Sequence, residues 1–164
     1  VSGSVIVDSS RTVNVVLEKK PMIEVVDSAF SVSEPLEILV RAQNLGEVDF
    51  IEIVLQFDTE YFGDSWDFRR KLPIDWQVIP SDPGNGIIHL ALAITGGKTQ
   101  VIDDLTSIVS IELTAKKIGT SQVTFTSYTS VGGVYFETNI YSLDRGKLSG
   151  SNLMLEEGTI TITN

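Results

Sequence analysis

The sequence predicts an all-β protein, a jelly-roll β-sandwich of about nine short strands. Short runs rich in Val, Ile, Thr and aromatic residues recur along the chain, and apolar and polar positions alternate within them. Clusters of Gly, Pro, Asn and Asp separate these runs, and such clusters are typical of turns. No long run shows a convincing helical period. These three observations favour two packed sheets over any helical fold.

The expected strands follow one another at close intervals, and each alternates as the half-buried surface of a sheet does. The turn signals between them include Asn44–Asp49, Pro80–Gly86 and Thr95–Thr99. The expected strands are Thr12–Glu18, Met22–Asp27, Leu36–Asn44, Phe50–Phe57, Gly86–Ile94, Ser107–Ala115, Ser121–Tyr128, Gly132–Glu137 and Gly158–Asn164.

Three stretches are less regular. Asp64–Asp75 mixes charged and aromatic residues, and we expect it to form a loop over one end of the sandwich. Thr138–Glu157 is polar, and we expect a hairpin flap there. Residues 1–20 are expected to form an extra N-terminal strand or a linker segment, and residues 21–164 the sandwich module.

Composition narrows the classes of function. The net charge of −10 argues against nucleic acid and anionic membrane surfaces, because like charges repel. The chain has no Cys, which excludes disulfides, thiolate metal sites and a Cys nucleophile. Its apolar runs fall short of the ~20 residues that a membrane-spanning helix needs, so no membrane insertion is expected. Without an initiator Met or a signal peptide, we expect a mature fragment or an excised module.

Signatures of catalysis are weak. The single His, His89, lies in the middle of an expected strand. A catalytic His needs a positioned partner, so we interpret His89 as a structural residue of the sheet. Two of the loop carboxylates could face each other as in a glycosidase, but 22 acidic residues produce many accidental pairs. We therefore expect no enzyme and no catalytic residue.

Oxygen ligands that suit calcium occur in three loops, but none has the full EF-hand spacing. We expect no metal site and no cofactor in this chain. Asp82 is expected to accept a hydrogen bond from nearby backbone in its turn, and Asp58 to cap the bend after Phe50–Phe57. The residues considered as ligands are Asp64, Asp67, Asp82, Asn85, Asp103 and Asp104.

Five aromatic residues lie between Tyr61 and Trp76. Rows of aromatic rings are typical of sugar-binding surfaces, so an alternative function is a carbohydrate-binding module of a secreted polysaccharide-active protein. Trp66 would be its central residue, although Trp66 could equally close one end of the sandwich. Trp76 is expected to be buried, because it alternates with Ile74 and Val78.

The order of these pieces resembles the cohesin modules of cellulosomal scaffolding proteins and their relatives outside cellulosomes. The similarity runs from about Met22 to Asn164. "MIEVVD" and "EPLEILVRAQNL" resemble the first two strands of the family, and "VDFIEIVLQFDTEYF" its alternating strand, which closes in an aromatic-Asp pair and a bend. "GNGIIHLALAITGG", "LTSIVSIELTAKKIGTSQVTF" and the final "GTITI" are similar to later strands of the family.

The resemblance implies a nine-stranded jelly roll that has no catalytic activity. It implies that the module binds a dockerin, a small helical domain loaded with calcium, through one open face of a sheet. The calcium would belong to that partner. The implied location is extracellular or at the cell surface, and polysaccharide is the partner under the alternative function.

The resemblance also implies a set of partner-binding residues on three strands. Ala91 and Ala93 would leave a flat surface on which helices can approach, while Phe50 and Val54 would add apolar area within a polar surround. The other interpretation is that these side chains touch an overlying loop. The implied residues are Phe50, Glu52, Val54, Gln56, His89, Ala91, Ala93, Thr95, Gly96, Gly97, Tyr128 and Val131.

Overall fold

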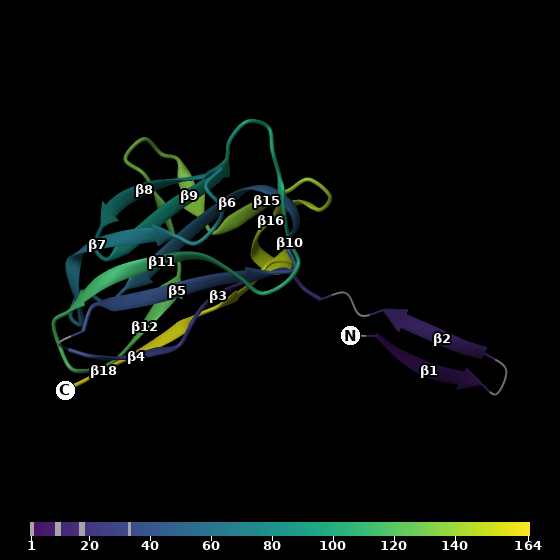
Figure 1. Cartoon of the computed structure of the whole chain (residues 1–164), viewed down its shortest axis with the longest axis horizontal. Coiled ribbons are helices and arrows are strands. Elements are labelled where there is room, and N and C mark those ends of the chain that lie inside the picture. Colours follow the sequence, from purple (N-terminus) through teal and green to yellow (C-terminus); the bar gives the residue numbers. More distant parts are fainter. Residues whose placement is uncertain (1, 9–10, 17–18, 33) are drawn as a thin grey trace.

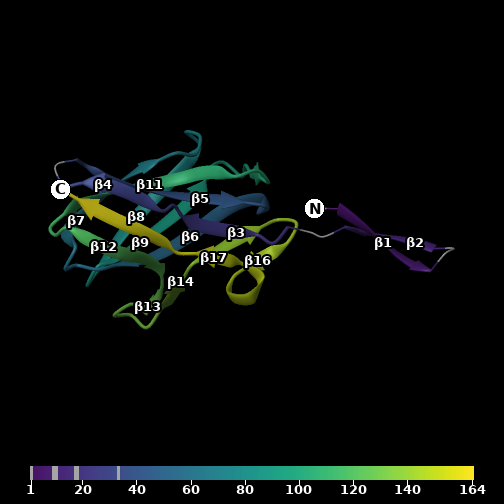
Figure 2. The ribbon, with the colours of Figure 1, turned by 90° about the horizontal axis from the view of Figure 1, so that it is seen from below.

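The computed structural model describes residues 2–8, 11–16, 19–32 and 34–164, with side chains from residue 19 onward. Two sheets pack face to face, and Figures 1 and 2 show them from two directions. The described residues contain one 3-10 turn, η1 (Gly150–Asn152), and otherwise only strands and their connections. The prediction of a jelly-roll β-sandwich is confirmed.

The larger sheet has nine strands and is built around β6 (Gly46–Phe57). β6 pairs with β9 and β10 along one edge and with β12 and β15 along the other. Beyond these lie β8 next to β9, β16 next to β15, β18 next to β12, and β4 next to β18. Their bounds are β4 (Ser28–Ser31), β8 (Trp76–Gly84), β9 (Ile87–Ile94), β10 (Gln100–Ile102), β12 (Gly119–Phe125), β15 (Asn139–Ser142), β16 (Gly146–Leu148) and β18 (Gly158–Thr163).

The smaller sheet has five strands in the order β17-β3-β5-β11-β7. Its pairs are antiparallel except for β17 with β3, and the larger sheet likewise has one parallel pair, β18 with β4. The bounds are β3 (Met22–Val25), β5 (Leu36–Gln43), β7 (Phe62–Arg70), β11 (Thr106–Ala115) and β17 (Met154–Glu156). Two further pairs stand apart from both sheets: β1 (Ser2–Asp8) with β2 (Arg11–Val16), and β13 (Ser127–Thr129) with β14 (Tyr135–Glu137).

The chain passes from the smaller to the larger sheet between β3 and β4. The first residues of β18 pack against this connection and bond to it. The Asp27 carboxylate accepts a hydrogen bond of 2.6 Å from the amide of Thr159. Gly158 lies so close to Val25 that a Cβ built on it would stand 2.5 Å from the Val25 Cγ1 atom. A side chain at residue 158 would therefore push the two strands apart.

The core lies between the sheets and is supplied by the inward positions of each strand. Ile51, Ile53, Leu55 and Phe57 of β6 are all buried there, as their alternation predicts. The predicted burial of Trp76 is also confirmed, and its indole Nε1 donates a hydrogen bond of 2.7 Å to Gln100.

The prediction of a loop over Asp64–Asp75 is wrong for most of that stretch, because β7 occupies Phe62–Arg70. In β7, Trp66 and Phe68 pack against the core, whereas Asp67 and Arg69 are exposed. β7 therefore has the two-residue period of a strand. The charged residues on its outer face make this period difficult to recognise in the sequence.

The polar stretch Thr138–Glu157 does contain a hairpin, β15–β16, but this hairpin extends the larger sheet instead of lying over it as a flap. At the N-terminus, the expected strand Thr12–Glu18 corresponds to β2, except that Leu17 and Glu18 lie outside the described residues. The division between residues 1–20 and 21–164 stays a prediction.

Candidate binding face

The larger sheet turns one side away from the core, and we call the part of this side over β8, β9, β6 and β15 the outer face. Three pairs of residues on β6 and β9 face each other there. They are Phe50 with Ala93, Glu52 with Ala91, and Val54 with His89. Because paired residues project to the same side of a sheet, these six predicted residues do share one face.

A bulge in β6 sets which residues face outward. Val48 and Ile51 both point into the core although they are three positions apart. The pairing of β6 with β15 shifts at the same place, between Tyr141 and Ser142. An extra residue at this point re-aims the strand, so that Phe50 faces outward and Ile51 inward.

The outer face gains four side chains that the sequence analysis did not identify. Gln77 and Ile79 of β8 lie opposite Ala93 and Ala91. Tyr141 and Asn139 of β15 lie opposite Phe50 and Glu52. The alternation of residues 76–79 in the sequence could have indicated that Ile79 faces outward. If Trp76 and Val78 point into the core, then Gln77 and Ile79 point away from it.

Part of the outer face is open and apolar. Ile79 is 63% exposed and Tyr141 is 48% exposed. The Tyr141 ring meets the Phe50 ring edge to face, with 5.7 Å between centroids. Between the strands that carry Ile79 and Phe50, the outward side chains of β9, Ala91 and Ala93, are small and half-buried. We call this surface the open strip: Phe50, Ile79, Ala91, Ala93 and Tyr141.

The rest of the outer face is covered. Val54 is fully buried and His89 is 6% exposed. The hairpin of β13 and β14, residues 127–137, lies over them, and Figure 2 shows it outside the larger sheet, on the side away from β5 and β11. We call it the covering hairpin. The expectation that Val54 and His89 lie on an open surface is therefore wrong, because an overlying segment touches them.

Aromatic rings form the contact between the covering hairpin and the sheet. Tyr128 and Phe136 lie opposite each other in the hairpin and stack at 5.1 Å between centroids. The Phe136 ring lies 4.8 Å from the His89 ring. Tyr128 thus faces the sheet, whereas Val131 at the tip of the hairpin is fully exposed.

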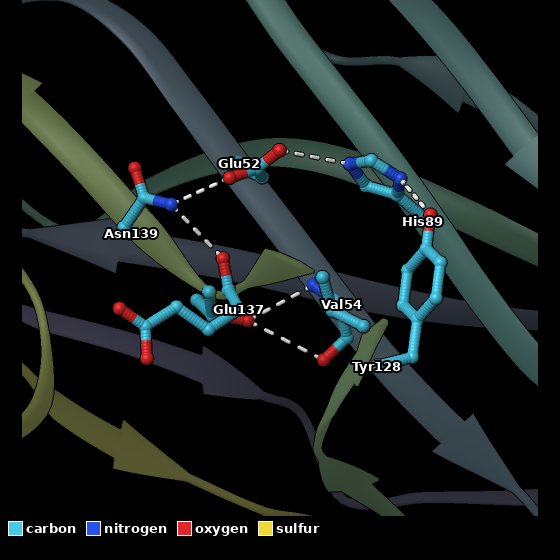
Figure 3. A network of polar contacts seen from close by, with 7 residues as sticks. Glu52, Val54, His89, Tyr128, Glu137 and Asn139 are labelled. Atoms are coloured by element: carbon cyan, nitrogen blue, oxygen red, sulfur yellow. Dashed lines mark hydrogen bonds and ion pairs between the residues drawn. The ribbon is translucent and has the colours of Figure 1, made fainter. Parts of the chain in front are cut away.

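A polar network ties His89 to its neighbours, and Figure 3 shows it from close by. The Nε2 atom of His89 lies 3.0 Å from the Glu52 carboxylate, and its Nδ1 atom lies 2.8 Å from the Tyr128 hydroxyl. The Asn139 side-chain amide donates to the other carboxylate oxygen of Glu52 at 2.5 Å. Both ring nitrogens are thus occupied, which is the environment of a structural histidine.

The covering hairpin interrupts the edge of β6. β12 pairs with β6 from Phe57 to Leu55, and β15 resumes the pairing at Glu52. In the gap, the amide of Val54 donates to the Thr138 hydroxyl at 2.9 Å. The Val54 carbonyl accepts from the amide of Thr126 at 3.1 Å. A side-chain hydroxyl thus takes the place of a strand partner.

Other predicted residues lie at the borders of the face. The Gln56 amide donates to the carbonyl of Asn85 at 2.8 Å, which ties Gln56 to the β8–β9 turn. Thr95, Gly96 and Gly97 form an exposed turn after β9, and both glycines have positive φ, which few other residues adopt readily.

The loop carboxylates behave as turn residues. Asp58 accepts a hydrogen bond of 2.8 Å from the amide of Glu60, and Asp82 accepts one of 2.9 Å from the amide of Gly84, so both predictions are confirmed. Within residues 19–32 and 34–164, no three acidic or His side chains gather closely enough to hold a metal ion. None of the helices described could cross a membrane.

Trp66 lies away from the outer face. It lines a groove of about 540 Å³ together with Pro35, Glu112 and Leu113. Its ring also packs against the core, and in the register of the smaller sheet it lies opposite Leu113. Trp66 is therefore a half-buried groove residue rather than an exposed aromatic platform.

No protein-family model and no curated protein sequence matches the chain, but solved structures do. It is similar to the cohesin module of a Clostridium perfringens family 33 glycoside hydrolase, with 15% identity, a TM-score of 0.67, and 88% of this chain and 97% of that chain covered. The non-cellulosomal cohesin of the archaeon Archaeoglobus fulgidus is 14% identical, with a TM-score of 0.65 and coverage of 89% and 93%.

A third similar structure is a chain of the type I cohesin–dockerin complex Coh-OlpA–Doc918 from Clostridium thermocellum. It is 14% identical, with a TM-score of 0.64 and coverage of 88% and 100%. The likeness thus extends over nearly the whole of each neighbour. The chain has the cohesin fold, as the resemblance of its sequence implied.

Proposed function

We propose that the chain is a non-catalytic module that binds a dockerin-bearing protein on its outer face, outside the cell or at its surface. The observation that carries the proposal is the open strip, an apolar surface on the cohesin fold that no described residue covers. Several similar structures are complexes of a cohesin with a dockerin. In this proposal any calcium belongs to the partner, and the module contributes only a binding surface.

The shape of the open strip suits a helical partner. β8 and β6 flank β9, so these two strands lie about 10 Å apart across the small Ala91 and Ala93, with Ile79 beside Ala91 and Phe50 beside Ala93. That spacing is close to the diameter of an α-helix with its side chains, about 10–12 Å. Ile79, Phe50 and Tyr141 would form the apolar contacts, and a chain of net charge −10 would favour a partner with basic residues at the rim.

Binding measurements test the proposal directly. The probes are Doc918 from Clostridium thermocellum and the ScaB dockerin from Acetivibrio cellulolyticus, both loaded with calcium. We expect at least one to bind. Replacing Ile79 and Tyr141 together by Ser should then weaken binding at least 100-fold, because apolar anchors each contribute about 2 kcal/mol when buried in an interface.

The matched control is Ile118→Ser, which removes a similarly exposed Ile from the turn between β11 and β12. We expect this variant to bind as wild type does. If the double variant also binds as wild type, the open strip is not the docking surface. If neither probe binds the wild-type chain, dockerin binding itself is contradicted for these partners.

The groove beside Trp66 supports a second candidate, carbohydrate binding. Its lining combines an indole with carboxylates, the side-chain types that stack on sugar rings and bind sugar hydroxyls. Retention of the chain on insoluble cellulose or xylan, lost in Trp66→Ala, would favour this function. Equal elution of both forms from a column without polysaccharide is the control.

A further inference from the structure

The covering hairpin is an insertion in a strand. If the chain continued from Phe125 as a regular strand, residue 128 would lie opposite Glu52. Asn139 takes that position instead. Eleven residues, 128–138, are thus added at the centre of the outer face. The rest of the sheet closes on both sides of the insertion, so the sandwich does not need the hairpin for its pairing.

The hairpin is weakly attached. Its two strands have three residues each and pair only with one another among the described strands. Isolated two-stranded hairpins are marginally stable in water. Its hold on the face consists of the Tyr128 and Phe136 rings on His89 and a hydrogen bond between Tyr128 and His89. At the end of the hairpin, the Glu137 carbonyl accepts a hydrogen bond of 3.0 Å from the Asn139 side-chain amide, and the Glu137 carboxylate lies 3.5 Å from Lys147. Segments with so few contacts open far more often than the whole domain unfolds.

The sheet residues beneath the hairpin are also bonded to one another. Glu52 and Asn139 belong to β6 and β15, and both stay bonded when the hairpin moves away. His89 then loses Tyr128 but keeps Glu52. Opening therefore leaves the buried Glu52 carboxylate with its partners. The cost of opening is confined to the stacked rings, the Tyr128–His89 bond, the bonds at Val54 and the contacts of Glu137.

We propose that the covering hairpin is a gate on the outer face, which opens while the sandwich stays folded and uncovers Val54 and His89. The outward positions of β9 run from His89 through Ala91 to Ala93. Opening the gate therefore adds one more row of side chains, Val54 and His89, to the open strip. The role of this gate in docking rests on the proposed function, whereas its opening does not.

The amide of Val54 reports the gate. It donates to the hydroxyl of Thr138, at the base of the hairpin. Successive amides of a strand point to opposite edges, so the amides of Ile53 and Leu55 point toward β9 and report the sheet. In hydrogen exchange followed by NMR on the free chain, we expect Val54 to exchange at least 100-fold faster than Ile53 and Leu55.

A pair of tyrosine variants sharpens the measurement. Tyr128→Ala should speed exchange at Val54 at least tenfold and leave Ile53 and Leu55 within twofold of wild type. Tyr135→Ala is the matched control, because Tyr135 belongs to the same hairpin but is exposed, and it should change none of the three rates. The gate is refuted if Val54 exchanges at the rate of its neighbours, or if Tyr128→Ala speeds all three amides equally.

Binding of Doc918 to wild type and to Tyr128→Ala then tests whether the gate controls docking. We expect at least a threefold change in affinity, because the variant no longer holds the gate closed. Equal affinities would show that docking is independent of the gate. Failure of Doc918 and the ScaB dockerin to bind either form would contradict the proposed function and not the gate, which the exchange rates decide by themselves.

Discussion

On the outer surface of the smaller sheet, the register brings Glu37, Glu112 and Asp67 into one row, whereas the open strip of the larger sheet has apolar side chains at its centre. Like charges directly opposite each other destabilise a sheet. Here Lys71 bonds Glu37 at 2.7 Å and Arg69 pairs with Glu112. The smaller sheet therefore balances the charges on its surface with exposed ion pairs, while the larger sheet leaves apolar side chains exposed in the open strip.

The comparison extends to single carboxylates. The side chain of Glu52, on the larger sheet, is 13% exposed and holds two side chains of the buried network. The side chain of Glu112, on the smaller sheet, is 29% exposed and is paired with a mostly exposed Arg69. The same residue type is thus part of the packed structure on one face and of the solvated surface on the other.

The largest expected effect is that of Glu52→Ala. The change removes the carboxylate that bonds both His89 and Asn139 and leaves the buried Nε2 atom of His89 unpaired, so we expect a loss of about 3 kcal/mol in the free energy of unfolding. Glu112→Ala is the matched change on the smaller sheet and should cost less than about 1 kcal/mol. Urea unfolding of both variants measures the difference, and equal losses would show that the two faces do not differ as described.

Arg69→Gln should have a smaller effect. It leaves Glu112 between two like charges, so we expect a loss of about 1 kcal/mol at low salt. In about 1 M salt, where charges are screened within about 3 Å, most of the loss should disappear. Lys98→Gln, which removes one exposed ion pair without an opposing row of carboxylates, is the control and should cost less. A loss that does not depend on salt would exclude the electrostatic cause.

The smallest effect concerns pH. The hydrogen bond from Lys71 lowers the pKa of Glu37 below its ordinary value. A lowered pKa in the folded state means that the stabilisation is present above the ordinary glutamate pKa and is lost as pH falls through the folded value. Because the pair is well exposed, Lys71→Met should cost about half a kcal/mol at neutral pH. Unfolding at neutral and at acid pH should show this cost vanishing, while an NMR titration should show the pKa of Glu37 rising.

The sequence was a good guide where one strand's own pattern decides the structure. The alternation of β6 predicted which of its residues enter the core, and the resemblance to cohesins placed Phe50, Ala91 and Ala93 on one face. The sequence failed to predict the accessibility of an outward residue where another segment packs over the strand. Val54 has the pattern of an outward residue, and it does face outward, but the pattern carries no information about the hairpin that covers it.

Other failures have a different cause. Asp64–Asp75 reads as a loop because charge dominates its composition, yet an edge strand with one solvated face tolerates such residues. β8 was missed because Pro80 interrupts it, and an edge strand accepts a proline that a central strand would exclude. Because β8 was missed, Ile79 was missed too, although it is one of the most exposed apolar residues of the open strip.

The sequence by itself determined the class of fold, many of the turns and the inward half of the strands that it identified, because these follow from the two-residue period and from local backbone preferences. Only the tertiary structure decided which outward residues stay accessible. That outcome depends on residues 127–137 folding back over β6 and β9, far from them in sequence. The same folding places Phe50 and Val54, four residues apart on one strand, in different surroundings: Phe50 is half-buried in the open strip, and Val54 is covered.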